Sequence, residues 1–260
     1  YSSHGCRMTA VKVEEIMIAA IARMLSGLSH VAVGAASPIP GSAALLAREL
    51  SGGSMRVSLL GRETHPTFTE GGRELFDCAA QGRIDAFFLS GVQIDGAANI
   101  NLVYIGDPDK PKARFPGSFG SAYLYYLVPR VILFRQEHTP RTLVERVDFI
   151  SAPGKSEENI YRPGGPHALV TGRCVFSFDA SAERFILQTV HPGHTLEEIR
   201  SETGFEFSIP ESGVKETSAP EKKWLDMIRG PVGDEIGEIY PEVAANIVRA
   251  SETTQPLGPP

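Results

Sequence analysis

The stretch SGVQIDGAANINLVYIGDPDKPKARFPGSFG, residues 90–120, decides how this chain folds. It joins an apolar strand to a turn, a second apolar strand, a basic loop and a Gly/Ser turn that opens another apolar run. Working outward, short apolar runs alternate with helical patterns through the first half of the chain. Such βαβ alternation predicts a parallel sheet covered by helices.

On the N-terminal side, residues 9–28 carry apolar side chains at three- and four-residue steps, which predicts a helix. HVAVG (30–34) predicts a strand, and the two prolines of SPIPGS predict that the next helix begins only at about Ser42. MRVSLL, IDAFFLS and NINLVYIG predict further strands, and RELFDCAA predicts a helix between the first two of them.

The second half changes character, because VILF, RVDFIS, CVFSF and RFILQTV predict short strands joined by polar turns, in a more mixed or antiparallel arrangement. Thr195 and Glu198 form a capping-box pattern at the start of a helix, and PEKKWLDMIRG predicts a last short helix. We therefore expect an α/β fold, with one domain over residues 9–230. Residues 1–8 are interpreted as an added segment with the native start at Met8, and residues 231–260 as an extended C-terminal tail.

Composition excludes several classes of protein. The 260 residues carry a net charge of −6, so no basic stripe for nucleic acid is expected. No apolar run approaches 18 residues and no signal peptide is evident, which predicts a cytoplasmic protein without membrane contact. Three widely spaced cysteines predict free thiols. His191 and His194 flank Pro-Gly without an acidic third ligand, so no metal site is expected.

The quoted stretch resembles the B subunit of family I coenzyme A transferases, closest to the glutaconate type. The family's GAQIDxxGNxN turn stands here as GVQID followed by NIN, with Ala98 at a glycine position. Its IGD, PKxRF and GSGGA motifs stand as IGD, PKARF and GSFGS, with Phe119 replacing a glycine. VDFISAPG and HPGHTLEEIRSETGFEF are similar to later family motifs, so the resemblance covers residues 31–207.

The resemblance implies a three-layer open sheet with helices on both faces. It also implies a separate A (alpha) subunit, in a heterodimer or heterotetramer, with acyl-CoA in the cleft between the two chains and coenzyme A as part of the substrate rather than a permanently bound cofactor. In the family a glutamate of the B half attacks the thioester and becomes a glutamyl-CoA thioester. Here the matching position is Leu60, which cannot form that bond. The nearest acid is Glu63, which is either a displaced nucleophile or a solvated loop acid.

Candidate binding residues follow from both the resemblance and the chemistry. A glycine-permitted turn at 117–121 can present backbone N–H groups to an oxyanion on a thioester carbonyl, or it is only a surface turn. Basic residues before it suit a phosphate-bearing ligand, with Arg114 matching the family. Gln93 follows a buried strand and can face the cleft. The expected CoA- and substrate-binding residues are Gln93, Arg114, Gly117, Ser118, Phe119, Gly120 and Ser121.

Three functions remain open. The chain is one half of a CoA-transferase, or it binds acyl-CoA while the partner's acid/base drives hydrolysis, ring opening or decarboxylation, or it is a non-catalytic half of the complex. Asp95, Asn99 and Asn101 are interpreted as caps of their turn. Glu137 and His138 end a predicted strand as a possible acid/base pair. Ser58 lies on a predicted strand with no partnered histidine evident, so a serine nucleophile is not supported.

Overall fold

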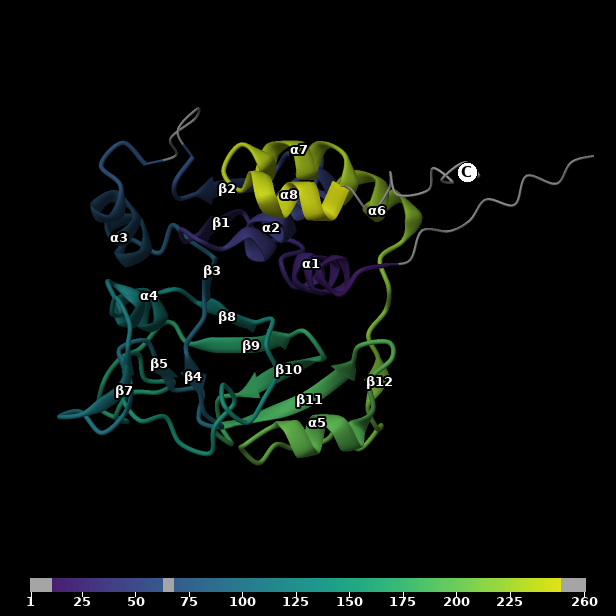
Figure 1. Ribbon diagram of the computed structural model, residues 1–260. Helices are drawn as coiled ribbons and strands as arrows, with labels where there is room; N and C mark the ends of the chain where they lie inside the picture. Colours follow the sequence, from purple (N-terminus) through teal and green to yellow (C-terminus); the bar gives the residue numbers. More distant parts are fainter. Residues whose placement is uncertain (1–10, 63–67, 249–260) are drawn as a thin grey trace, which may run out of the picture.

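In a computed structural model, residues 11–62 and 68–248 build one eight-stranded sheet with helices packed on both faces (Figure 1). The strand order is β12-β11-β10-β9-β8-β3-β1-β2. Strands β2, β1, β3, β8 and β9 run parallel, β10 is antiparallel to both of its neighbours, and β12 is parallel to β11. The predicted α/β class and the mixed second half are confirmed. The strands are β1 (His30–Val33), β2 (Arg56–Leu59), β3 (Ala86–Leu89), β8 (Arg130–Arg135), β9 (Pro166–Thr171), β10 (Cys174–Asp179), β11 (Arg184–Val190) and β12 (Lys215–Glu216).

Two short antiparallel ribbons stand beside the sheet, and both come from the stretch that opened the sequence analysis. They are β4 (Gln93–Ile94) with β5 (Ile100–Asn101), and β6 (Tyr104–Gly106) with β7 (Pro111–Arg114). The predicted single strand NINLVYIG is therefore two strands, β5 and β6. The predicted strand RVDFIS is not a strand of this sheet, and its last residue lies beside an isolated bridge between Ile100 and Ala152.

The central strands are buried on both faces, which is why they read as continuous apolar runs. Side chains of a strand alternate between the faces. In β8, Ile132 faces one hydrophobic cluster while Val131 and Leu133 face the other. In β3, Phe88 faces the first cluster and Phe87 the second. The two clusters account for the two helical layers.

One layer contains α1 (Val13–Met24), α2 (Pro38–Leu50), α6 (Lys222–Arg229), α7 (Pro231–Gly237) and α8 (Pro241–Val248). The opposite side is covered by α3 (Gly72–Ala80), α4 (Ser121–Leu127) and α5 (Leu196–Glu202). Figure 1 shows α1 and α5 on opposite sides of β8–β11. The predicted capping box of α5 is confirmed, since Thr195 Oγ1 accepts from the N–H of Glu198 at 3.2 Å and the Glu198 carboxylate accepts from the N–H of Thr195 at 2.9 Å.

The expected start of the second helix was wrong. Helix α2 begins at Pro38 rather than near Ser42, so both prolines lie in its first turn. A first-turn residue has no intrahelical acceptor for its N–H, and the fixed φ of proline suits the helix. Proline there opens the helix instead of delaying it.

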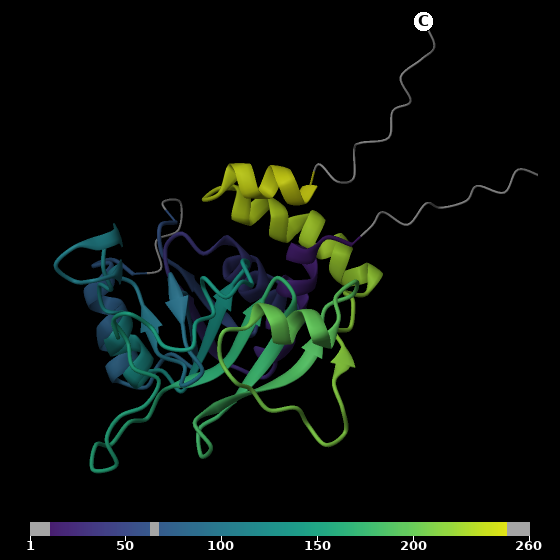
Figure 2. The same cartoon turned by 60° about the horizontal axis from the view of Figure 1, so that its bottom comes forward.

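The extended tail expected at 231–260 was also wrong over its described part, since α7 and α8 occupy 231–248 (Figure 2). Val232 and Ile236 are fully buried against α2, which supplies the stabilisation that a short helix rich in glycine and acidic residues lacks by itself. Arg229 of α6 adds a bidentate ion pair with Glu15 of α1, at 2.6 and 2.9 Å. Residues 1–8, expected to lie outside the fold, fall outside the described residues, as does the end of the tail from residue 249.

No helix within residues 11–62 and 68–248 is long and apolar enough to cross a lipid bilayer.

Candidate active site

A cavity of about 430 Å³ opens at the carboxyl ends of the parallel strands β1, β2, β3 and β8. Ligands of open α/β sheets bind at this edge. The wall combines the turns after β1 and β2, the ends of β3 and β8, the helices α3 and α4, and the turn that precedes α4. The described lining residues are Gly34, Ala35, Ala36, Ser37, Leu60, Leu75, Phe76, Phe87, Phe88, Leu89, Ser90, Leu102, Gly117, Ser118, Phe119, Ser121, Leu124 and Phe134.

The predicted turn at 117–121 lies on this cavity. Gly117 has φ +103° and Gly120 has φ +67°, conformations that glycine adopts without a steric penalty. The turn closes through a 2.7 Å hydrogen bond from the N–H of Ser121 to the carbonyl of Ser118. Among the described residues, none accepts a hydrogen bond from the N–H of Phe119 or Gly120. Two peptide donors beside the cavity are therefore left for another acceptor.

Aromatic rings frame the mouth of the cavity. Phe119 is 84% exposed, and its ring centroid lies 5.6 Å from that of Phe76 on α3. The Phe76 ring also meets Tyr123 of α4 edge-on at 5.6 Å. A side chain at Gly120 would force the Phe76 ring to move, because an added Cβ would overlap the outer edge of that ring. The glycine thus permits both the backbone conformation of the turn and its close approach to α3.

Leu60 faces the same cavity from the end of β2. Its N–H donates to the carbonyl of Val33 at 3.0 Å, which continues the β1–β2 pairing by one residue. Leu60, which the resemblance matches to the family's glutamate, is therefore an apolar residue of the cavity wall. Glu63, the nearest acid in the sequence, lies outside the described residues.

The C-terminal helices hold the two turns beside Leu60. Arg62 donates to Glu235 of α7 at 2.6 Å and to Glu238 at 3.2 Å. The hydroxyl of Tyr240 accepts from the N–H of Ser37 at 3.3 Å. The C-terminal segment, expected to be a tail, thus forms helices that fix the turns after β1 and β2. No motif in the sequence indicates that contact.

A polar rim adjoins the cavity at the end of β8, where Arg135, Gln136 and Glu137 line a shallow hollow that shares Ala36 and Ser90 with it. Desolvation would raise the pKa of Glu137, but hydrogen bonds from Arg141, Thr139 and Arg135 outweigh it and hold the pKa below its usual value. Glu137 is therefore a carboxylate paired with cations.

His138 does not share that rim, so the acid/base pair with Glu137 that the sequence left open does not form. Its ring is buried, 2.8 Å from the Thr171 hydroxyl and 2.9 Å from that of Thr203, and burial lowers its pKa to about 3. His191 is likewise buried, between the Thr217 hydroxyl and the Thr171 carbonyl, with its pKa lowered to about 4 by burial. Both rings are neutral parts of the core. Within the described ranges, no group of three or more His, Cys, Asp or Glu is arranged to hold a metal ion.

The expectation that Gln93 faces the cleft was wrong. Gln93 is buried, and its amide oxygen accepts from Asn101 at 2.7 Å and from the N–H of Asp148 at 3.0 Å. Its amide nitrogen donates to the Asp148 carboxylate at 3.1 Å. All of these hydrogen bonds are made inside the protein, so Gln93 joins β4 and β5 to the loop that contains Asp148 instead of lining the cavity.

Asp95 and Asn101 cap nearby backbone N–H groups as expected, whereas the side-chain oxygen of Asn99 accepts from the N–H of Gly154 at 3.0 Å, outside the turn. The carboxylate of Asp95 accepts from the N–H groups of Ala97 and Asn99 at 3.1 and 3.0 Å. Ala98, which stands at the family's glycine position, is fully buried with φ +59°. A left-handed conformation explains why glycine suits that position.

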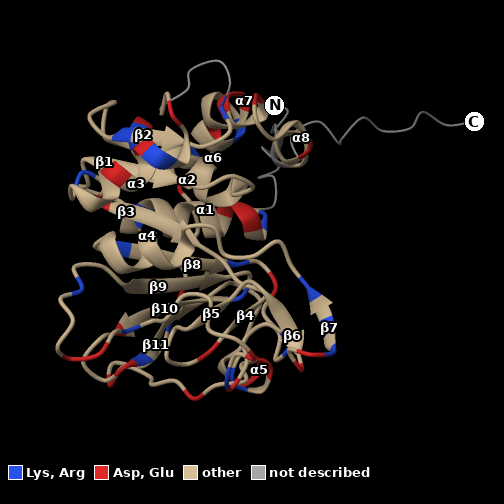
Figure 3. Ribbon diagram, turned by 90° about the vertical axis from the view of Figure 1, so that its left-hand side faces the viewer, with Lys and Arg blue, Asp and Glu red and all other residues tan. Residues whose placement is uncertain are grey.

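Arg114 lies on β7, in a ribbon that projects from the body and is blue, the colour of Lys and Arg, over part of its length in Figure 3. It is exposed and donates to the carbonyl of Pro108 at 3.0 Å. It does not line the cavity, although the chain from Arg114 leads directly into the 117–121 turn.

Ser58 has a partner that the sequence did not reveal. Its hydroxyl lies 2.7 Å from Nε2 of His30, across the β1–β2 pair, while Nδ1 of the ring lies 2.7 Å from the carbonyl of Arg83. Both side chains are buried within the sheet and neither lines the cavity. The pair is a satisfied core contact, so the conclusion against a serine nucleophile is unchanged.

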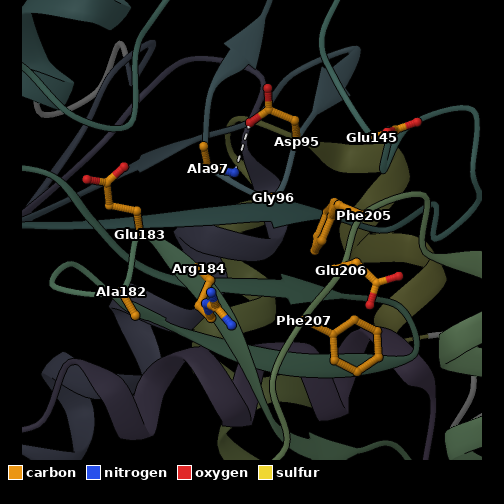
Figure 4. A pocket seen from close by; sticks show the side chains of 10 residues that line it. All are labelled: Asp95, Gly96, Ala97, Glu145, Ala182, Glu183, Arg184, Phe205, Glu206 and Phe207. Atoms are coloured by element: carbon orange, nitrogen blue, oxygen red, sulfur yellow. Dashed lines mark hydrogen bonds between the residues drawn. The ribbon is translucent and has the colours of Figure 1, made fainter.

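A second hollow, also of about 430 Å³, lies by the β4–β5 turn and the β10–β11 turn and shares no lining residue with the cavity (Figure 4). Its described lining mixes Phe205 and Phe207 with exposed Glu145, Glu183 and Arg184. It contains none of the residues expected to bind coenzyme A.

Comparison with known proteins gives the class of this molecule. The coenzyme A transferase family model matches residues 9–202, most of the chain. The chain belongs to the coenzyme A transferase family.

Three curated relatives narrow the resemblance to the B half of these enzymes. The chain is 34% identical over 217 residues to the B subunit of 3-oxoadipate CoA-transferase from Pseudomonas knackmussii, covering 80% of each protein. It is 30% identical to the B subunit of glutaconate CoA-transferase from Acidaminococcus fermentans, over 55% of this chain and 54% of the relative. It is 29% identical to the cholesterol ring-cleaving hydrolase IpdB subunit of Rhodococcus jostii, over 60% and 62%.

Solved structures confirm the predicted fold. The decarboxylase AibA/AibB superposes with a TM-score of 0.72 and 25% identity, covering 85% of this chain and 94% of that one. IpdAB of Rhodococcus jostii superposes with a TM-score of 0.74 and 25% identity over the same shares. One fold therefore serves relatives named as transferases, a hydrolase and a decarboxylase.

Proposed function

We propose that this chain is the B half of a heteromeric enzyme that binds an acyl-CoA thioester and transforms the acyl group, by hydrolysis, ring opening or decarboxylation, with the catalytic acid/base on an A subunit. The observation that carries the proposal is Leu60, which lines the cavity where transfer chemistry needs a carboxylate. No described lining residue has an ionisable side chain. Coenzyme A is then part of the substrate and no permanently bound cofactor is involved.

The residues of this chain have definite tasks in that reaction. The N–H groups of Phe119 and Gly120 are free to donate to the oxygen of the thioester carbonyl, where negative charge grows when the acyl group is attacked or loses a substituent. The apolar wall keeps water away from that charge, which strengthens each hydrogen bond to it. The general acid or base must then come from outside the described wall.

The open side of the cavity and the names of the relatives both support a second chain as the partner of this one. The mouth carries the exposed ring of Phe119, so one side of a bound thioester stays in water unless a second chain covers it. Relatives named as B subunits, and the paired names AibA/AibB and IpdAB, support an A subunit as that chain.

CoA transfer is the second candidate, favoured by the 34% identity to the 3-oxoadipate CoA-transferase relative. Transfer needs a carboxylate that attacks the thioester carbon and expels the CoA thiolate, which leaves a mixed anhydride on the protein. The thiolate then attacks the carboxyl carbon of the protein residue, which releases the acyl group as a free acid and leaves a CoA thioester on the protein. Leu60 cannot supply that group. Under this alternative Glu63 supplies it.

The test uses the chain co-purified with its A subunit and incubated with acetyl-, hexanoyl- and glutaryl-CoA. Liquid chromatography with mass spectrometry follows the acyl-CoA species, and intact-protein mass spectrometry looks for CoA bound to this chain. We expect conversion of a thioester without any added carboxylic acid and without a protein adduct. An adduct on Glu63 together with strict dependence on an acceptor acid would establish transfer instead.

A Leu60→Glu variant tests the position itself, with Leu60→Gln as an isosteric control that cannot form an anhydride. If residue 60 faces the thioester carbonyl, the glutamate variant traps CoA on residue 60 and the glutamine variant does not. Equal behaviour of the two variants would place the reacting carbonyl elsewhere.

A further inference from the structure

We propose that the acyl group received by this chain is apolar along its length, a saturated, branched or ring-containing hydrocarbon, and does not end in a second carboxylate. This inference rests on the proposed binding of acyl-CoA and adds the substrate class. It also narrows the proposed reactions to hydrolysis of the thioester, because decarboxylation needs a second carboxyl group on the acyl chain and ring opening needs a carbonyl in the ring. It separates the chain from transferases whose names specify dicarboxylic acids.

The wall of the cavity carries the argument. Five leucines and five phenylalanines make up ten of the described lining residues, and serines are the only polar side chains among these residues. Serine hydroxyls donate single hydrogen bonds and carry no charge. A carboxylate taken from water into such a wall loses its hydration without gaining a counter-ion, whereas a hydrocarbon gains from the same transfer.

The guanidinium groups nearest the cavity, those of Arg62 and Arg135, each pair with acidic side chains, although the buried Nε–H of each has no partner among the described residues. Arg135, on the neighbouring rim, donates to Glu137 at 3.1 Å, and Glu137 also receives Arg141 at 2.8 Å. Arg62 is held by two acidic side chains of the C-terminal helical layer. Because those two Nε atoms are buried, a distal carboxylate would gain a two-point contact with a guanidinium only by breaking one of these ion pairs.

The exposed ring of Phe119 is the second, independent observation. A large apolar side chain at the mouth of a cavity has most of its surface in water, 84% in this case. Hydrocarbon lying against the exposed face of Phe119 would remove that surface from water and would extend the contact that Phe119 already makes with Phe76, whose ring centroid lies 5.6 Å away. An acyl chain long enough to reach the mouth therefore binds more tightly than a two-carbon one.

Two thioesters matched in length provide the experiment. Hexanoyl-CoA and adipoyl-CoA have the same number of acyl carbons and differ in the terminal carboxylate. Isothermal titration of the complex with its A subunit should give hexanoyl-CoA a Kd on the order of 100-fold lower than that of adipoyl-CoA. Equal or tighter binding of adipoyl-CoA would overturn the inference. If neither these thioesters nor free CoA binds, the proposed function itself fails, which is a distinct result.

Variants assign the preference to this cavity. Leu60→Arg introduces a cation into the wall and should favour adipoyl-CoA, while Leu60→Met, of similar volume and no charge, should retain the preference for hexanoyl-CoA. Phe119→Ala should weaken the binding of hexanoyl-CoA several-fold more than the binding of acetyl-CoA. Tyr161→Ala is the matched control, because Tyr161 is 81% exposed but lies outside the lining. A preference unaltered by Leu60→Arg would place the acyl chain outside this cavity.

Discussion

Replacing Gly120 by alanine tests the geometry of the turn beside the cavity, because the added methyl group has two separate free-energy costs, one from the backbone conformation and one from packing. The backbone φ is +67°, and an added Cβ would lie 2.5 Å from Cε1 of Phe76 and closer still to its Cζ. The left-handed conformation costs an L-residue about 1–2 kcal/mol. Forcing an extra carbon into a packed site costs a further ~1–3 kcal/mol. We expect Gly120→Ala to lower the free energy of unfolding by about 2–5 kcal/mol in total.

Gly27 is the matched control, because it isolates the backbone penalty. Its φ is +79°, and no described atom lies within 4 Å of an added Cβ. Gly27→Ala should therefore cost only about 1–2 kcal/mol. The difference between the two variants measures the overlap with Phe76.

A double-mutant cycle identifies the ring as the cause. In a Phe76→Ala background the ring is absent, so Gly120→Ala should lose its packing penalty and cost about as much as Gly27→Ala. Urea unfolding followed by far-UV circular dichroism measures all of these variants. The reasoning is refuted if Gly120→Ala costs no more than Gly27→Ala, or if its cost is the same with and without the ring.

Two further predictions concern stability. Glu15→Gln removes the buried carboxylate that pairs with Arg229 and should lower the free energy of unfolding by ~3–5 kcal/mol. Glu70→Gln, in an exposed pair with Arg73, should cost under about 1 kcal/mol, and equal urea midpoints of the two variants would contradict this. Because burial lowers the pKa of His138 to about 3 and that of His191 to about 4, the unfolded chain binds protons at these groups first as the pH falls below about 6.5. Stability should decline below that pH by about 1.4 kcal/mol per pH unit for each histidine, until its folded-state pKa is reached. His138→Gln should remove about half of that slope in unfolding measurements between pH 7 and 5, and an unchanged slope would assign the acid sensitivity to other groups.

The sheet could be predicted from the sequence because its central strands are short apolar runs buried on both faces. Runs of this kind, such as residues 30–34 and 84–90, can be recognised in the sequence without knowing which helices cover the two faces of the sheet. The tertiary layer from α6 to α8 could not be predicted so well. The stability of α7 depends on Val232 and Ile236 meeting α2, and that contact has no signature in a local window of sequence.

In the candidate site, too, locally determined features could be predicted from the sequence and long-range contacts could not. The glycines of the 117–121 turn were predictable because a left-handed backbone restricts the choice of residue. Gln93 was misassigned because its partners, Asn101 and Asp148, lie eight and 55 residues away in the chain. The contact between His30 and Ser58 spans 28 residues across a parallel pair, so spacing in the sequence gave no sign of it.

The layer that joins α1 and α2 to α6, α7 and α8 affects how the protein is made. The first helices emerge early from the ribosome, yet Ile228, Val232 and Ile236, which complete their apolar cluster, are among the last residues of the fold to be synthesised. Until those residues emerge, the nascent chain exposes an apolar surface of the kind that chaperones recognise. This layer is therefore completed only after residues 228–236 have been synthesised.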